Sequence, residues 1–171
     1  PVAYAKLGTL GQNAIQRKKD EDGLIVLDGA TTSLSGAGTT LASGVVAAAT
    51  SRIKGNTTEP SIGPIRSVLH PYLVKDIFDE LLAGVGTYVV SEGPTADVFM
   101  KGFTLPVAGA EVYEDGNITI DSADDAKGGV FAREGVLLVQ GRTPWAKTVR
   151  NEKLAGGATE VLLYDEYAYG E

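Results

Sequence analysis

The chain has 171 residues, a net charge of −7 and no cysteine, which excludes disulfide frameworks, thiolate zinc sites and cysteine nucleophiles. A single histidine excludes a site with several histidine ligands, and the acidic balance argues against tight, sequence-independent binding of nucleic acid. Apolar residues make up 43% and charged residues 22%, a composition typical of a globular protein.

The first predicted element is a helix over residues 2–22, with Gly23 as its C-terminal cap. Its apolar residues recur at helical spacing and predict a stripe that lies on a sheet or on a neighbouring subunit: Tyr4, Leu7, Leu10 and Ala14. A short apolar run follows at 24–27. Residues 31–40 are rich in Gly, Ser and Thr, which predicts an exposed loop.

A second helix is predicted from Ser43, as its N-cap, to Gly55. Residues 65–69 alternate like a half-buried strand, and a helix then begins at Pro71 and stops at Gly84. The apolar stripe of that helix is Leu73, Val74, Ile77, Phe78, Leu81 and Leu82. We expect it to form a core against the second helix, through Val45, Val46 and Ile53.

The remaining chain is predicted to be mostly strands and loops. Residues 85–104 indicate a long irregular excursion, and 107–113 a strand that turns at 115–117 into 118–120. Residues 128–131 lead into a short helix or strand that ends near Val139. The ranges 148–153 and 158–168 are predicted to be antiparallel strands joined at 155–157. The fold class is therefore α+β.

The last strand alternates over 158–168, and both of its faces are partly apolar. The first helix can cover one face, and we expect a neighbouring subunit to cover the other. Acidic residues in this strand and basic residues in the first helix could set the register of such a contact. The candidate intersubunit residues are Arg17, Lys18, Lys19, Asp165, Glu166 and Tyr167.

No catalytic constellation is predicted from the residues. His70 precedes Pro71, where it could act as a general base, but the favoured interpretation is an imidazole that caps a backbone group at a strand-to-helix junction. Asp121, Asp124 and Asp125 lack the spacing of a calcium loop and favour a solvated loop. We therefore expect no catalytic, cofactor-binding or metal-binding residues.

An ordered series of short segments carries a family resemblance. The segments are residues 18–24 at the end of a helix, Gly55-Asn56, 63–65, 68–72, 75–77 and 126–131. Together they resemble the major capsid proteins of tailed bacteriophages with the Hong Kong 97-type shell fold, over about residues 5 to 170. No single motif among them is diagnostic of this family, and the ordered combination carries the resemblance.

The resemblance implies three regions. Residues 1–27 are expected to be the end of the spine helix of a peripheral domain, 28–145 a mixed α/β axial domain, and 146–171 the returning antiparallel strands of the peripheral domain. The family's N-terminal arm and extended hairpin loop have no counterpart here, and the first residue is not Met. We therefore expect a C-terminal portion or a processed chain, and the crosslinking that some relatives perform from that loop has no support.

The resemblance also implies a function. The chain is expected to be a structural subunit, not an enzyme, that assembles into pentamers and hexamers of an icosahedral capsid. The capsid would form in the host cytoplasm and enclose double-stranded DNA without sequence-specific binding, with decoration proteins as further partners and no membrane contact. Two alternatives stay open: a nanocompartment shell with protein cargo, and a small acidic hydrolase or carbohydrate-active enzyme that uses Asp or Glu.

Overall fold

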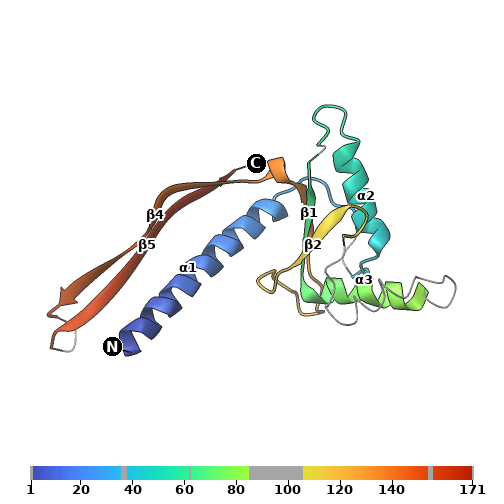
Figure 1. The fold of residues 1–171 in the computed structure, drawn as a ribbon. Helices are drawn as coiled ribbons and strands as arrows, with labels where there is room; N and C mark the ends of the chain where they lie inside the picture. The colour runs from blue at the N-terminus through green and yellow to red at the C-terminus, as the bar shows by residue number, and fades with distance from the viewer. Residues whose placement is uncertain (1, 36–37, 62, 85–105, 154–155, 171) are drawn as a thin grey trace. The chain divides into compact units, whose positions relative to one another are not determined.

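The computed structural model describes residues 2–35, 38–61, 63–84, 106–153 and 156–170. Within them the helices are α1 (Val2–Asp28), α2 (Ser43–Lys54), α3 (Pro71–Gly84) and the short 3-10 helix η1 (Arg133–Gly135), as Figure 1 shows. The strands are β1 (Ile65–Leu69), β2 (Ala110–Glu114), β3 (Gly129–Ala132), β4 (Leu137–Asn151) and β5 (Ala158–Gly170). The predicted α+β class is confirmed.

The chain divides into two compact units. Unit 1 consists of Pro1–Gly23 with Leu137–Glu171, and unit 2 consists of Leu24–Val136. The boundary expected after residue 27 falls in the last turn of α1, and the boundary expected after residue 145 falls inside β4. The predicted excursion over 85–104 lies outside the described residues.

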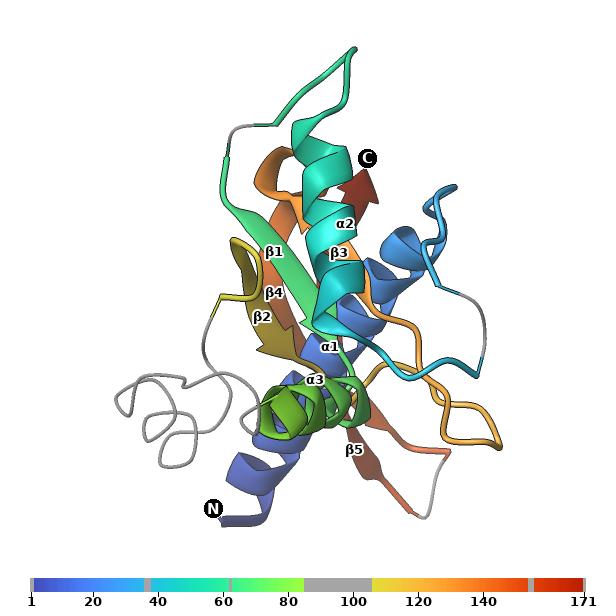
Figure 2. The same ribbon diagram turned by 90° about the vertical axis from the view of Figure 1, so that its right-hand side faces the viewer.

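Unit 2 has a three-stranded sheet in the order β2-β1-β3, with β2 parallel and β3 antiparallel to β1. Figure 2 shows α2 on one face of this sheet. The buried core comes from α2, α3, β1 and β2. It consists of Val46, Ile65, Leu69, Val74, Ile77 and Ala110. The predicted shared core of the α3 stripe and α2 is confirmed for Val46 and Ile53, whereas Val45 does not belong to this cluster. Phe78, by contrast, is only half-buried.

The N-terminus of α2 differs from the prediction. The N-cap is Ala42, which provides no side-chain hydrogen bond, so Ser43 is already inside the helix. Carboxylates from α3 accept the amide protons there: Glu80 from Ser43, and Asp76 from Leu41 at 3.3 Å. A carboxylate at a helix N-terminus also complements the helix dipole, so α3 replaces the missing local cap.

The strand predicted at 118–120 is also not formed, and Ile120 makes only an isolated bridge to Ala126. The turn before it is real, because Asp115 accepts the amide proton of Asn117 at 2.8 Å. The chain then closes a second turn around Asp121, so two successive turns replace the predicted hairpin.

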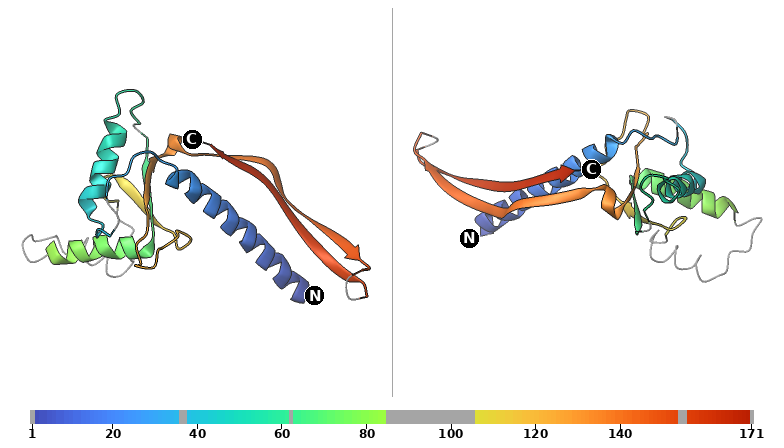
Figure 3. Two further views of the ribbon diagram at one scale, coloured as in Figure 1. Left: turned by 180° about the vertical axis from the view of Figure 1, so that it is seen from behind. Right: turned by 90° about the horizontal axis from the view of Figure 1, so that it is seen from above.

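In unit 1, α1 runs alongside a two-stranded antiparallel hairpin formed by β4 and β5, as both views of Figure 3 show. The predicted end of the helix at Gly23 is wrong, since α1 continues to Asp28 and the cap is Gly29. Gly23 lies against the ring of Tyr169, where an added Cβ would stand 3.2 Å from the ring. The glycine therefore permits close contact inside a continuous helix.

The helix face that meets the hairpin is not the predicted one. Leu7 and Leu10 are 47% and 66% exposed. The partly buried positions recur at helical spacing instead along another face: Gly11, Ile15, Lys19, Asp22 and Gly23. The predicted stripe does not face the hairpin because the covered face, apart from Ile15, is made of glycine and polar residues, whose contacts hydrophobic periodicity does not detect. The other expected position of the stripe, on a neighbouring subunit, stays a prediction.

Strand β4 is longer than predicted. The sequence pattern did not reveal its first part because the strand contains two irregularities there. The pairing with β5 shifts register between Gln140 and Arg142 and again between Arg142 and Trp145. Gly141 and Pro144 lie at these two points. Each interrupts the alternation that identifies a strand in a sequence, and Pro also removes a ladder donor.

Candidate functional site

Unit 1 carries most of the residues that the sequence singled out, and β5 separates them onto two faces. Val161, Leu163, Asp165, Tyr167 and Tyr169 are partly buried, whereas the residues between them, from Leu162 to Ala168, are exposed. The predicted alternation is therefore confirmed. We call the first set the inner face, since it contacts α1, and the opposite side the outward face.

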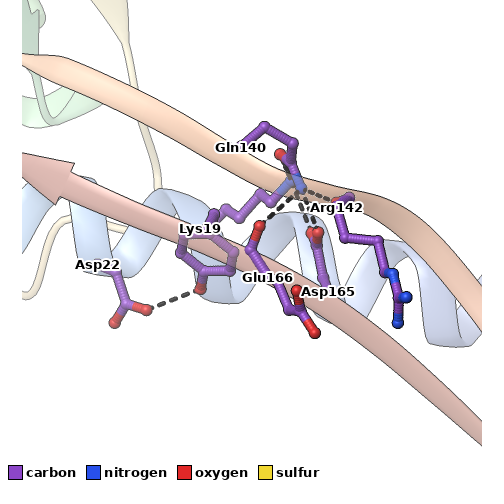
Figure 4. Close-up of polar contacts among 7 residues, drawn as sticks. Lys19, Asp22, Gln140, Arg142, Asp165 and Glu166 are labelled. Atoms are coloured by element: carbon purple, nitrogen blue, oxygen red, sulfur yellow. Dashed lines mark hydrogen bonds and ion pairs between the residues drawn. The ribbon is translucent and has the colours of Figure 1, made fainter.

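A polar network joins α1 to the inner face (Figure 4). Lys19 Nζ lies 2.6 Å from Asp165 Oδ2, and the two side chains are 20% and 3% exposed. Lys19 also donates to Gln140 Oε1 at 2.8 Å and lies over the Tyr167 ring. The Tyr167 hydroxyl donates to Asp22 at 2.7 Å. Lys19 and Asp22 of α1 thus each have a direct partner in the hairpin.

Gln140 holds the first irregularity of β4 in place. The two N–H donors of its Nε2 are shared among three acceptors, which are the backbone carbonyls of Arg142 at 2.7 Å and Glu166 at 3.2 Å and the Asp165 carboxylate. A bulge disrupts the regular ladder locally, and the side-chain amide supplies donors at that point. Because the same side chain accepts from Lys19, the helix and the bulge are connected.

The network perturbs its titratable groups in the directions expected from their partners. The hydrogen bond from Lys19 lowers the pKa of Asp165, and hydrogen bonds from Lys18 and then Tyr167 lower that of Asp22. The bond to Asp22, reinforced by desolvation, raises the pKa of Tyr167 to about 12. The ionised carboxylates and the neutral phenol are therefore the favoured forms.

The candidate intersubunit residues lie in three different places. Lys19, Asp165 and Tyr167 belong to the network inside the chain. Arg17 and Lys18 are exposed and pair along α1, with Glu21 at 2.9 Å and Asp22 at 2.6 Å. Glu166 lies on the outward face. The role of these residues between chains stays a prediction.

The outward face is apolar and aromatic. Trp145 stacks on Tyr164 with ring centroids 4.5 Å apart, and Arg142 lies 5.7 Å from the Trp145 ring centroid. These side chains remain exposed, Trp145 by 39% and Tyr164 by 41%. Cross-strand pairing places the other members beside them: Val139 with Ala168, Lys147 with Leu162, and Val149 with Glu160. The face is thus a continuous strip along the hairpin.

His70 has the structural role that was favoured for it. The side chain is 8% exposed, and its Nδ1 accepts the amide proton of Tyr72 at 3.2 Å, in the first turn of α3. In unit 2, Asp121 accepts amide protons from Ala123 and Asp125, which closes its loop locally. Among the described residues, no group of three or more His, Cys, Asp or Glu side chains is placed to hold a metal ion. In the same part of the chain, no helix has the length and apolarity to cross a membrane.

The sequence reasoning missed Gln140, Asp22 and the Trp145–Tyr164 stack. The available signal was local: Gly141 and Pro144 interrupt an otherwise strand-like segment, and a polar residue beside such an interruption is a candidate to satisfy the backbone. The pairing of Trp145 with Tyr164 depends on the register shifts, which no pattern in the sequence revealed.

Comparisons with protein-family models, curated proteins and solved structures found no match to this chain.

Proposed function

We propose that the chain is a structural, non-enzymatic subunit that assembles with copies of itself into an icosahedral capsid of the Hong Kong 97 type. Such a capsid would enclose double-stranded DNA and belong to a virion assembled in the host cytoplasm. The observation that carries the proposal is the hairpin of unit 1, which α1 covers on its inner face while its outward face stays apolar and exposed.

The physical argument begins with the stability of the hairpin. A two-stranded sheet is at best marginally stable in water unless it packs against another element. Here α1 supplies that element on one side only. On the other side Leu137, Val139 and Trp145 are 61%, 51% and 39% exposed. A strip of this kind is typical of a surface that another molecule covers.

The secondary structure of the two units also supports the proposal. A long helix beside long antiparallel strands is what the capsid resemblance implies for a peripheral domain, and the mixed sheet of unit 2 is what it implies for an axial domain. Leu7 and Leu10 add a second exposed apolar surface on α1. Several separate contact surfaces per chain are what a closed shell requires, because each subunit has several neighbours.

Particle formation tests the proposal directly. The purified chain is analysed by size-exclusion chromatography with light scattering and by negative-stain electron microscopy, at increasing concentration and ionic strength. Pentamers, hexamers or closed shells are expected. A monomer under every condition, together with turnover of an ester, phosphoester or glycoside substrate, would favour the hydrolase alternative and refute the proposal.

The cargo separates the two shell hypotheses. Particles isolated from expressing cells are treated with nuclease and then opened. DNA that survived inside them supports the capsid, whereas a defined protein cargo without DNA supports the nanocompartment.

A further inference from the structure

The outward face of the hairpin has its charges sorted by strand. The basic residues Arg142 and Lys147 lie on β4, and the acidic residues Glu160 and Glu166 lie on β5. The apolar and aromatic side chains lie on the same two strands at other heights, centred on the Trp145–Tyr164 stack. The face therefore has a basic edge along β4 and an acidic edge along β5, each interrupted by apolar side chains.

We propose that this face packs against the same face of a second copy of the chain, about a two-fold axis that runs parallel to the strands. The inference rests on the proposed self-assembly and specifies one of its contacts. Rotation about such an axis places β4 of one copy over β5 of the other. Each basic edge then meets an acidic edge, with Arg142 at the height of Glu166 of the second copy, because these two residues are register partners.

The alternative two-fold axis, perpendicular to the strands, is disfavoured by the same charges. That rotation reverses the strand direction and places β5 over β5. It also places β4 over β4, and Arg142 of one copy would then face Lys147 of the other when the contact is centred on the aromatic stack, because these two residues lie at equal heights on either side of it. Like charges placed directly opposite each other cost binding energy, and opposite charges set the register. The charge pattern selects the parallel axis.

The size of the face determines how strong the contact is. Strand β5 has 13 residues, which corresponds to a strip about 43 Å long and about 10 Å wide, or roughly 400 Å² from each copy. Roughly 800 Å² in total is below the range of stable interfaces, about 1,200–2,000 Å². An isolated pair of chains is therefore weakly bound, and the contact becomes persistent only where other contacts hold the two copies together.

Single-cysteine crosslinking tests the geometry, since the chain has no cysteine of its own. Packed sheets lie about 10 Å apart, so a bismaleimide that spans about 10 Å is used in place of a disulfide. With the parallel axis, Glu166→Cys and Glu160→Cys each link to themselves in a second copy. A mixture of the two variants gives little 166-to-160 product, because six residues of strand separate these heights by about 20 Å. Arg150→Cys, on the other face of β4, is the control.

Charge reversal provides an independent readout. Arg142→Glu should reduce the crosslinking yield of Glu160→Cys several-fold, whereas Arg150→Glu, with the same change in net charge, should leave it unchanged. Adding Glu166→Arg to Arg142→Glu should restore the yield. Urea unfolding of each variant shows whether the chain itself is intact.

The inference is overturned by a dominant 166-to-160 product, which indicates the perpendicular axis. It is also overturned by yields no higher than the Arg150→Cys control in assembled particles, which indicates another occupant of the face. In that second case the particles themselves still support the proposed function. Absence of particles, by contrast, counts against the proposed function, and the crosslinking of free chains at high concentration is then judged separately.

Discussion

Two glycines of α1 differ in a way that predicts opposite effects of the same substitution. At Gly8, apart from the neighbouring helix backbone, no atom lies within 4 Å of the position of an added Cβ, whereas at Gly11 that position overlaps Cδ1 of Leu163 on β5. Alanine is the better helix former, by about 0.5–1 kcal/mol. Gly8→Ala should therefore stabilise the chain by up to about that amount.

Gly11→Ala gains the same helix propensity but has to displace the Leu163 side chain. An off-rotamer side chain costs about 0.5–1.5 kcal/mol, and overpacking a well-filled contact costs about 1–3 kcal/mol. The gain is at best cancelled, so we expect Gly11→Ala to be about 1–3 kcal/mol less stable than Gly8→Ala. Leu163→Ala in the Gly11→Ala background should recover part of this difference, because it removes the obstructing atoms.

The single tryptophan makes the measurement specific to unit 1. Trp145 lies in β4, stacked on Tyr164, so its fluorescence reports unfolding of the hairpin. Urea titrations of the two variants and the parent chain give the free energies of unfolding. Equal values for Gly8→Ala and Gly11→Ala would show that α1 does not pack on β5 at this position, and would contradict the covered helix face described above.

Three further predictions concern the core and the polar network. Ile77→Ala should lower the free energy of unfolding by about 2–5 kcal/mol, because Ile77 is fully buried. Phe78→Ala should lower it less, because Phe78 is only half-buried. Thermal unfolding followed by circular dichroism compares the two variants. The lowered pKa of Asp165 means that its contribution to stability is present above the unfolded pKa of about 4 and is lost as the pH falls through the lower folded value. Asp165→Asn should flatten that acid dependence in urea titrations at pH 2 to 6. The raised pKa of Tyr167, about 12, means that its contribution is present below about pH 10 and is lost between about pH 10 and 12, a loss that Tyr167→Phe should abolish.

The strand-turn-helix unit around His70 was predictable because independent local signals agree there. Alternation predicts β1, Pro71 fits the first position of a helix, and the apolar spacing of α3 matches its buried face. The capping role of His70 follows from the same junction. Each signal acts within a few residues, so no tertiary information was needed.

The extent of α1 was not predictable from the same kind of signal. A glycine near the end of a helical pattern usually marks a C-terminal cap. Gly23 instead lies against Tyr169, which is far away in the sequence. Because Gly23 has no side chain, the Tyr169 ring can approach the helix closely. Only the long-range packing distinguishes the two uses of glycine.

The candidate site was predictable in its residues but not in its connections. Opposite charges on the first helix and the last strand were recognised, and the structure pairs Lys19 with Asp165 inside the chain. Removing one partner of this buried ion pair leaves the other charge buried without a partner. Substitutions of Lys19 or Asp165 should therefore impair the folding of unit 1 before they affect assembly. The charges on the outward face, such as Arg142 and Glu166, are available to a neighbouring copy, and substitutions there should cause defects in assembly without loss of folding.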